Sequence, residues 1–250
     1  MTLDAVSSDS GDFPLADLHA HVGAELPLAC VVQVARENGV KLGVVEHGGR
    51  GQKISDDKTL HQYVESLDAY PVYKGLQAEG LDWDTCFSAA AITQLDYVLS
   101  DALTFPDRDG SLVRLWRPEV HIEDAESFMD GYVDFTVQVM GSTPIDIIAN
   151  FTFLPACIAD QYDVLWTRDR MEKVVRAAVE HGLAIEINDR YRIPSPLCVT
   201  LACDAGARFC FGSNQHGDGI GRLDYPVRIA QECGLEEKDM FVPERKSRNG

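Results

Sequence analysis

Short apolar runs alternate with amphipathic segments along most of the chain. In the amphipathic segments apolar residues return every three or four positions, which is typical of a helix with one buried face, and the clearest example includes Met171 to Val179. The apolar runs have the length of buried strands. They predict seven strand-and-helix units, with strands at 17–21, 41–46, 72–79, 96–101, 145–150, 183–188 and 209–211.

The alternation of strands and helices predicts an α/β fold, and polar candidates follow nearly every predicted strand. Barrel enzymes place their chemistry at the carboxyl ends of the strands, so this pattern favours a closed (β/α) barrel of the TIM-barrel type. A doubly wound sheet is the alternative. We expect a single domain over 1–250 with polar tails at both ends, because the sequence has no long linker and no low-complexity block.

One predicted connection is unusually long. The segment 105–117 is charged and aromatic, and it exceeds the usual few-residue connection between a strand and a helix. Long loops in compact domains are often functional, so we expect a functional or lid-like role for this segment.

The charge of the chain limits its partners. It carries 40 Asp and Glu against 22 Lys and Arg, a net charge of −18, which would repel a phosphate backbone or an anionic membrane. No run approaches the about 18 apolar residues of a membrane helix, and the start of the chain is too polar for a signal peptide. The seven cysteines include no CxxC pair, which suits free thiols. We expect a cytoplasmic protein without nucleic-acid or membrane partners.

His19 and His21 are the strongest candidates for metal chemistry. They stand one residue apart on the first predicted strand, so both side chains point to the same side. Imidazole with carboxylate suits Zn²⁺, Mn²⁺ or Fe²⁺, and the absence of paired cysteines argues against a thiolate zinc site. Further nitrogen and oxygen donors follow the other strands, namely Glu46, His47, Gln77, Glu79, Asp101, Asn150, Glu186, Asn188, Asn214 and His216.

Six short motifs, taken in order, resemble the PHP (polymerase and histidinol phosphatase) family over about residues 14–235. They are Asp17–His21, Gly43–Gly48, Leu95–Val98, Asp146–Asn150, Ile185–Asn188 and Phe211–His216. The resemblance implies a distorted seven-stranded (β/α) barrel that hydrolyses phosphoesters with two or three metals. It also implies that His19, His21, His47 and His216 are metal ligands.

The chain departs from the family's metal set at several positions. The bridging glutamate of the third motif falls on Gln77, with Glu79 one same-face step further on, and the expected histidine of the fourth motif falls on Leu103, with Asp101 nearby. Asn150 replaces a histidine. Asn214 similarly replaces an aspartate, while Glu46 stands where an aspartate is usual. Because amides are weak ligands, we expect one metal, at most two, with Glu79 rather than Gln77 reaching it.

The sequence therefore predicts a metal-dependent hydrolase, with a phosphoesterase favoured, that acts on a small anionic molecule through a metal-activated water. Asp101 would orient that water or shuttle its proton. The alternatives are hydrolysis of an amide or lactone, and a catalytically weakened relative that binds a ligand or partner. Substrate, metal identity and oligomeric state are left open. The predicted metal ligands are His19, His21, His47, Glu79 and His216; Glu46, Gln77, Asn150 and Asn214 are second candidates; Arg117, Glu186, Asn188, Arg190 and Arg192 would bind substrate.

Overall fold

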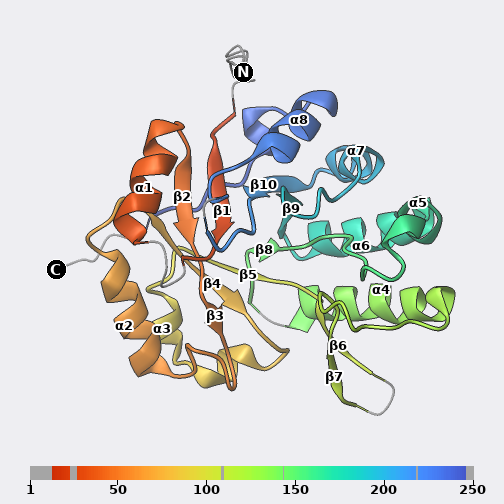
Figure 1. Cartoon of the computed structure of the whole chain (residues 1–250), viewed down its shortest axis with the longest axis horizontal. Helices are drawn as coiled ribbons and strands as arrows, with labels where there is room; N and C mark the ends of the chain where they lie inside the picture. The colour runs from red at the N-terminus through yellow and green to blue at the C-terminus, as the bar shows by residue number, and fades with distance from the viewer. Residues whose placement is uncertain (1–12, 23–26, 108–109, 143, 218, 246–250) are drawn as a thin grey trace.

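A closed parallel barrel forms the centre of the computed structural model, which describes residues 13–22, 27–107, 110–142, 144–217 and 219–245 (Figure 1). Pairing of β2 with β4 through Gly43 and Tyr73 closes the ring. The predicted seven-stranded (β/α) barrel is thereby confirmed. In spatial order the strands are β2 (Lys41–Val44), β1 (Ala16–Ala20), β10 (Arg208–Gly212), β9 (Ala184–Asn188), β8 (Ile147–Ile148), β5 (Tyr97–Ser100) and β4 (Tyr73–Ala78), with β3 (His47–Gly48) prolonging β2 beside β4.

Helices surround the barrel, and their apolar faces pack on the outside of the strands (Figure 1). Several begin at a side-chain cap: the Thr167 hydroxyl, for example, accepts a hydrogen bond from Arg170 N at the start of the helix that follows it. The α-helices are α1 (Leu28–Glu37), α2 (Asp57–Leu67), α3 (Ala89–Ile92), α4 (Ala125–Ser142), α5 (Tyr162–Leu165), α6 (Arg168–Glu180), α7 (Pro196–Asp204) and α8 (Asp224–Glu232); the 3₁₀ turns are η1 (Trp83–Cys86), η2 (Ala159–Gln161) and η3 (Glu237–Asp239).

Three predicted segments differ from the structure. The second predicted strand is divided into β2, which ends at Val44, and β3, which begins at His47. The fifth strand is reduced to β8, and the left-handed backbone of Asn150 (φ 51°) keeps it from reaching its predicted end. The segment expected to be a long loop holds an antiparallel hairpin of β6 (Thr104–Pro106) and β7 (Leu112–Arg114). Phe105 of this hairpin packs edge-on against aromatic side chains of α4, which explains its order.

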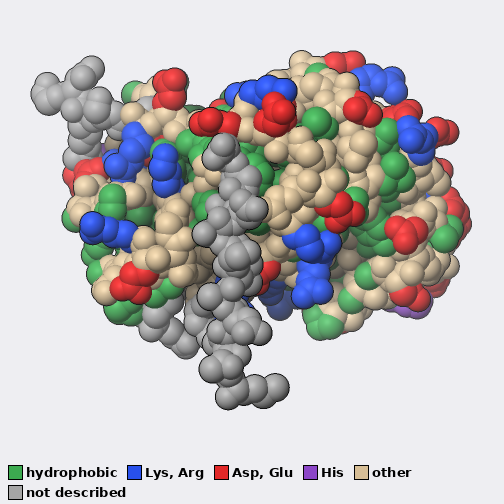
Figure 2. Space-filling model, turned by 90° about the horizontal axis from the view of Figure 1, so that it is seen from above, with side chains coloured by type: hydrophobic (Ala, Val, Ile, Leu, Met, Phe, Trp, Pro, Cys, Tyr) green, Lys and Arg blue, Asp and Glu red, His purple; other side chains and the backbone are tan. Residues whose placement is uncertain are grey.

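The molecular surface mixes charges of both signs. Viewed from above, Asp and Glu side chains lie dispersed among Lys, Arg and uncharged side chains on the visible part of this face (Figure 2). Among the described residues, no helix is long and apolar enough to cross a membrane. Of the predicted polar tails, residues 1–12 and 246–250 lie outside the described part of the chain.

A cluster that contains strand residues and no helical ones fills the barrel interior. Tyr97, one of the two tyrosines of this cluster, is 1% exposed and donates its hydroxyl to Leu18 O (2.7 Å). Glycines on neighbouring strands leave room for this ring: a Cβ at Gly75 would lie 2.4 Å from Tyr97 Cζ. The packing of Tyr97 in the barrel interior therefore requires a glycine at position 75.

We expect Gly75→Ala to lower the free energy of unfolding by about 1–3 kcal/mol, because the added methyl group overpacks the barrel. Gly131→Ala is the matched control: its Cβ would lie 3.6 Å from Phe105 Cζ, and an alanine inside α4 is expected to be neutral or to stabilise by about 0.5–1 kcal/mol. Urea denaturation of both variants measures the difference. Equal stability of Gly75→Ala and the wild type would contradict this packing.

Candidate active site

The polar residues singled out in the sequence gather at the carboxyl-terminal rim of the barrel. His19 and His21 lie at the end of β1, His47 begins β3, and Glu79 follows β4. A register shift in the pairing of β1 with β2 falls between Asp17 and Ala20, where such an irregularity can re-aim side chains. The remaining candidates on this rim are Asp101 after β5, Asn150 after β8, Glu186 and Asn188 on β9, and Asn214 and His216 after β10.

Three imidazoles lie face to face on this rim, and we call them the imidazole stack. The ring of His21 lies between those of His47 (centroids 4.8 Å apart, 17° between planes) and His216 (4.3 Å, 5°). Burial and the neighbouring histidines hold the pKa of His21 well below its usual value. Burial and nearby Arg190 lower the pKa of His216 as well. These two rings are therefore neutral at pH 7, the form in which imidazole binds metals.

Glu79 orients the third ring of the imidazole stack. Its Oε1 lies 2.8 Å from His47 Nδ1, and its Oε2 lies 3.4 Å from the hydroxyl of Thr104. Burial alone would lower the pKa of His47, but the hydrogen bond and charge of Glu79 raise it. A carboxylate on Nδ1 fixes the ring and leaves Nε2 available, as in many metal-binding histidines.

His19 is more constrained than the imidazole stack. Its Nδ1 lies 2.6 Å from Glu186 Oε1, with both side chains 1% exposed, and its Nε2 lies 3.2 Å from Gln77 Oε1. Burial opposes a charge here, but Glu186 outweighs it and raises the pKa of His19. The pKa of Glu186 is correspondingly lowered despite its burial. Both nitrogens of His19 are engaged, so a metal could reach Nε2 only if Gln77 turned away.

Amide side chains link His19 to the far side of the barrel, and we call them the amide network. Gln77 Nε2 and Asn150 Nδ2 both donate to Asp101 Oδ2, over 3.1 and 2.7 Å. Asn214 Nδ2 and Asn188 Nδ2 both reach Asn150 Oδ1, over 2.9 and 3.2 Å. Gln77, Asn150 and Asn214, which stand at three expected ligand positions, are thus linked into one network in which Asp101 joins Gln77 to Asn150.

Asp101 accepts hydrogen bonds from the amide network, and its pKa is raised above the usual value. Burial, followed by the charge of Glu79, raises the pKa of Asp101 to about 6. The two amide donors and the Leu103 amide (2.9 Å) favour its ionised form but do not offset the burial. A carboxyl group with this pKa can exchange a proton near neutral pH.

Strained backbone conformations accompany the site. Among the described residues, left-handed φ values occur outside glycine at Asn150 (51°), Thr152 (65°), Arg192 (54°) and Asn214 (49°), and all four follow barrel strands on this rim. Asparagine tolerates this region better than most residues, whereas threonine and arginine are strained in it. Strain of this kind concentrates at functional sites, where the surrounding contacts maintain it.

The three predicted substrate-binding arginines, Arg117, Arg190 and Arg192, do not form one cluster in the structure. Arg190 Nη1 donates to Asn214 O over 3.2 Å, and its charge acts on His216. Arg192 lies exposed in the segment after β9, and Arg117 lies exposed in the turn after β7. Glu46 accepts a hydrogen bond from His47 N (3.1 Å) and forms an ion pair with a lysine. Arg190 is therefore the arginine nearest to the imidazole stack by these contacts.

The chemistry of the donor set fits a divalent cation. The imidazole stack offers three adjacent imidazoles, one of which, His47, is hydrogen bonded to the Glu79 carboxylate. Three histidines with an open position are a common zinc ligand set. The rings lie stacked, however, and within the described residues no three His, Cys, Asp or Glu side chains converge on one point. Binding would require the rings to rotate toward a common centre.

The role of Asp17 was missed in the sequence, although it opens the first motif. It is fully buried and accepts hydrogen bonds from the backbone amides of Ser213 (2.9 Å), Gly221 (2.8 Å) and His19 (3.2 Å). It thereby ties β1 to the loop that carries His216. The signal available in the sequence was an aspartate on the first predicted strand, two residues before His19.

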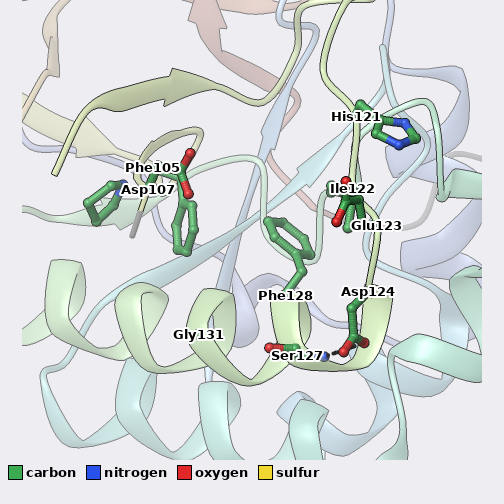
Figure 3. Close-up of a pocket in the computed structure, with 10 residues that line it drawn as sticks. Phe105, Asp107, His121, Ile122, Glu123, Asp124, Ser127, Phe128 and Gly131 are labelled. Atoms are coloured by element: carbon green, nitrogen blue, oxygen red, sulfur yellow. Dashed lines mark hydrogen bonds between the residues drawn. The ribbon is translucent and has the colours of Figure 1, made fainter. Parts of the chain in front are cut away.

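A cavity of about 620 Å³ lies between the β6–β7 hairpin and α4 (Figure 3). Phe105 and Phe128 form its apolar part, and Asp124 accepts a hydrogen bond from Ser127 N (3.0 Å) at its edge. Asp107 and Glu123 add further acidic groups. This acidic lining would repel a phosphate, so the cavity does not suit the predicted anionic substrate.

Comparison with known proteins supports the fold. A histidinol phosphate phosphatase from Lactococcus lactis subsp. lactis, solved with zinc, L-histidinol and phosphate, matches with a TM-score of 0.64 and 15% identity, covering 88% of this chain and 92% of that one. No protein-family model matches the sequence, and no curated protein matches it significantly.

Two further solved structures are less similar. An archaeal ribonuclease P with mature tRNA matches with a TM-score of 0.43 and 11% identity, covering 89% of this chain and 83% of that one. A variant of Rhizobium etli pyruvate carboxylase matches with a TM-score of 0.44 and 14% identity, covering 90% of this chain and 24% of that one. Both scores are too low to support a conclusion.

The similarity to the histidinol phosphate phosphatase, together with the closed barrel, shows that the chain has a PHP-like barrel fold.

Proposed function

We propose that the protein is a metal-dependent phosphoesterase that hydrolyses a small phosphomonoester. The observation that carries this proposal is the imidazole stack at the carboxyl-terminal rim of a PHP-like barrel. Glu79 is hydrogen bonded to His47 in this stack, and the charge of Arg190 acts on His216. The similar histidinol phosphate phosphatase supports the choice of a phosphate ester over an amide or lactone.

The imidazole stack would hold one divalent cation, which when bound acidifies a water molecule and polarises a phosphoryl oxygen. Glu79 would keep the ring of His47 in a fixed orientation. Arg190 would bind the phosphate through charge-assisted hydrogen bonds and hold it beside His216. Asp101, once ionised, would accept a proton from the attacking water, while the amide network keeps its carboxylate in place.

The amide network limits the number of metals. Gln77, Asn150 and Asn214 are neutral, and their side-chain amides are already hydrogen bonded within the network that reaches Asp101, so they do not offer the negative charge that more cations need. His19 would join the ligands only on losing its contact with Gln77. We therefore propose one metal for each chain, at most two, as the ligand types already indicated.

A substrate panel tests this proposal. The full chain, loaded with Zn²⁺ or Mn²⁺, is expected to release inorganic phosphate from small phosphomonoesters and to leave amides and lactones intact. Hydrolysis of an amide or lactone without phosphate release would instead favour the amidohydrolase alternative. No hydrolysis together with no metal uptake would favour a binding protein.

We expect Arg190→Ala to raise the KM for a phosphomonoester about tenfold to a hundredfold with little change in metal content, because one charge-assisted contact contributes about 1.5–3 kcal/mol. Arg176→Ala, on the exposed face of α6, is the matched control and should leave KM unchanged. Steady-state kinetics with metal analysis measures both. An unchanged KM in Arg190→Ala would show that this residue does not bind the phosphate of the substrate.

A further inference from the structure

We infer that Glu186 is a positioning residue of the proposed reaction, which fixes the carboxylate of Asp101 through two hydrogen-bonded routes. This inference rests on the proposed phosphoesterase function. The sequence places Glu186 among the substrate-binding candidates, whereas in the structure its side chain is 1% exposed and both of its carboxylate oxygens are hydrogen bonded within the protein. A side chain in this position acts on the reaction through the groups that it holds.

The first route runs through His19 and Gln77. Oε1 of Glu186 lies 2.6 Å from His19 Nδ1, and His19 Nε2 lies 3.2 Å from Gln77 Oε1. Gln77 Nε2 then donates to Asp101 Oδ2 over 3.1 Å. An ionised carboxylate only accepts hydrogen bonds, so the amide nitrogen of Gln77 must face Asp101 and its oxygen must face His19. Glu186 therefore fixes the ring of His19, which in turn keeps the Gln77 amide turned toward Asp101.

The second route runs through Asn150. Oε2 of Glu186 accepts a hydrogen bond from Asn150 N (2.7 Å), and Asn150 Nδ2 donates to Asp101 Oδ2 (2.7 Å). Asn188 Nδ2 supports this route, because it lies within hydrogen-bond distance of Glu186 Oε2 (3.0 Å) and of Asn150 Oδ1 (3.2 Å). The left-handed backbone of Asn150 (φ 51°) persists because surrounding contacts maintain it, and the contact with Glu186 is one of them.

Both routes end on the same oxygen of Asp101 and close a hydrogen-bonded cycle of Glu186, His19, Gln77, Asp101 and Asn150. Among the described residues, Oδ1 of Asp101 accepts one hydrogen bond, from Leu103 N (2.9 Å). A carboxylate oxygen can accept two hydrogen bonds, so Oδ2 is saturated and Oδ1 keeps one free position. We therefore expect Oδ1 to take the proton of the attacking water, with the cycle fixing which oxygen is free.

Gly212 leaves room for the hydrogen-bonded cycle. It lies on β10 and pairs with Asn188 of β9. A Cβ at Gly212 would overlap Glu186 Oε1 and would lie 2.7 Å from His19 Cβ. The contact between Glu186 and His19 therefore depends on the glycine at this position as well as on the two polar side chains.

Two substitutions of Glu186 separate positioning from substrate binding. Glu186→Leu breaks both routes, so kcat for a small phosphomonoester should fall about 10- to 100-fold while KM changes little. In Glu186→Gln the amide nitrogen can donate to His19 Nδ1 and the oxygen can accept from Asn150 N, so most of the rate should return. Glu180→Leu, exposed at the end of α6, is the matched control and should keep the wild-type kcat and KM. A raised KM with an unchanged kcat in both Glu186 variants would overturn the inference and assign Glu186 to substrate binding.

A double variant shows whether Glu186 acts through Asp101. Glu186→Leu should add little to the loss caused by Asp101→Asn, because the effects of groups that act through one another are not additive. Gln77→Leu breaks the first route alone, so it should lower kcat less than Glu186→Leu and should also add little to Asp101→Asn. This variant keeps the inference testable if Glu186→Leu does not fold. Equal fold losses with and without Asp101→Asn would contradict the proposed role.

Nuclear magnetic resonance of the full metal-free chain tests the geometry without turnover. The proton between His19 Nδ1 and Glu186 Oε1 is buried and should give a slowly exchanging, downfield signal in the wild type and in Glu180→Leu. The signal should disappear in Glu186→Leu and in His19→Ala. Phosphate release by the loaded wild type without this signal would overturn the inference alone, whereas the signal without any phosphate release would refute the proposed function and, with it, the role of the cycle in catalysis.

Discussion

His21→Ala is expected to remove the bound metal and the phosphatase activity together. His21 is the central ring of the imidazole stack, is 6% exposed, and is held neutral by burial and by its neighbours, so its loss removes a ligand and separates the other two rings. Changes beside a metal ligand cost about 10- to 100-fold in affinity, and loss of a ligand should cost more. Metal analysis and phosphate release measure both effects.

Two further histidine variants sharpen this prediction. His61→Ala, on the exposed side of α2, should keep full metal content and activity. His19→Ala should lose less metal affinity than His21→Ala, because both nitrogens of His19 are hydrogen bonded to Glu186 and Gln77. Stoichiometric metal in His21→Ala would show that the imidazole stack is not the metal site.

Asp101→Asn is expected to lower kcat by about a hundredfold to ten-thousandfold while the fold and the metal content persist. The amide oxygen of asparagine can still accept hydrogen bonds from the amide network, but the group can no longer accept a proton at neutral pH. The effect should fall on kcat more than on KM, because Asp101 is proposed to act on the attacking water.

The pH profile distinguishes this role from a structural one. Asp101 must be ionised to accept a proton, and burial raises its pKa to about 6, so wild-type kcat should fall as the pH drops through about 6. Asp101→Asn should lack this limb, and Asp204→Asn, exposed at the end of α7, should keep it. A variant that retains both the rate and the limb would rule Asp101 out as the base.

The barrel was predictable because each strand and its following helix carry a local periodicity. The amphipathic segment Met171 to Val179, for example, lies within α6. Strand ends were less predictable, since β8 stops early through the left-handed backbone at Asn150, a tertiary feature that apolar runs do not encode. The β6–β7 hairpin was missed for a similar reason, because it is ordered by Phe105 packing on α4.

The candidate site was only partly predictable. The strand-end rule identified the residues that gather on the rim, since parallel strands bring their carboxyl ends together. It could not show which donors hydrogen bond to one another, so the engagement of His19 by Glu186 and Gln77 became visible only in three dimensions. A pocket lined by Phe153, Tyr162 and Tyr191 was also missed, because these residues come from separate segments and resemble ordinary core residues in the sequence.

The number of metals bound by the full chain tests the central proposal most directly. After loading with Zn²⁺ or Mn²⁺ and removal of excess metal, elemental analysis of the wild type, His21→Ala and His61→Ala gives the stoichiometry for each chain. We predict one metal, at most two, in the wild type and in His61→Ala, and loss of metal in His21→Ala. Three metals for each chain, or none in the loaded wild type, would contradict the proposed site.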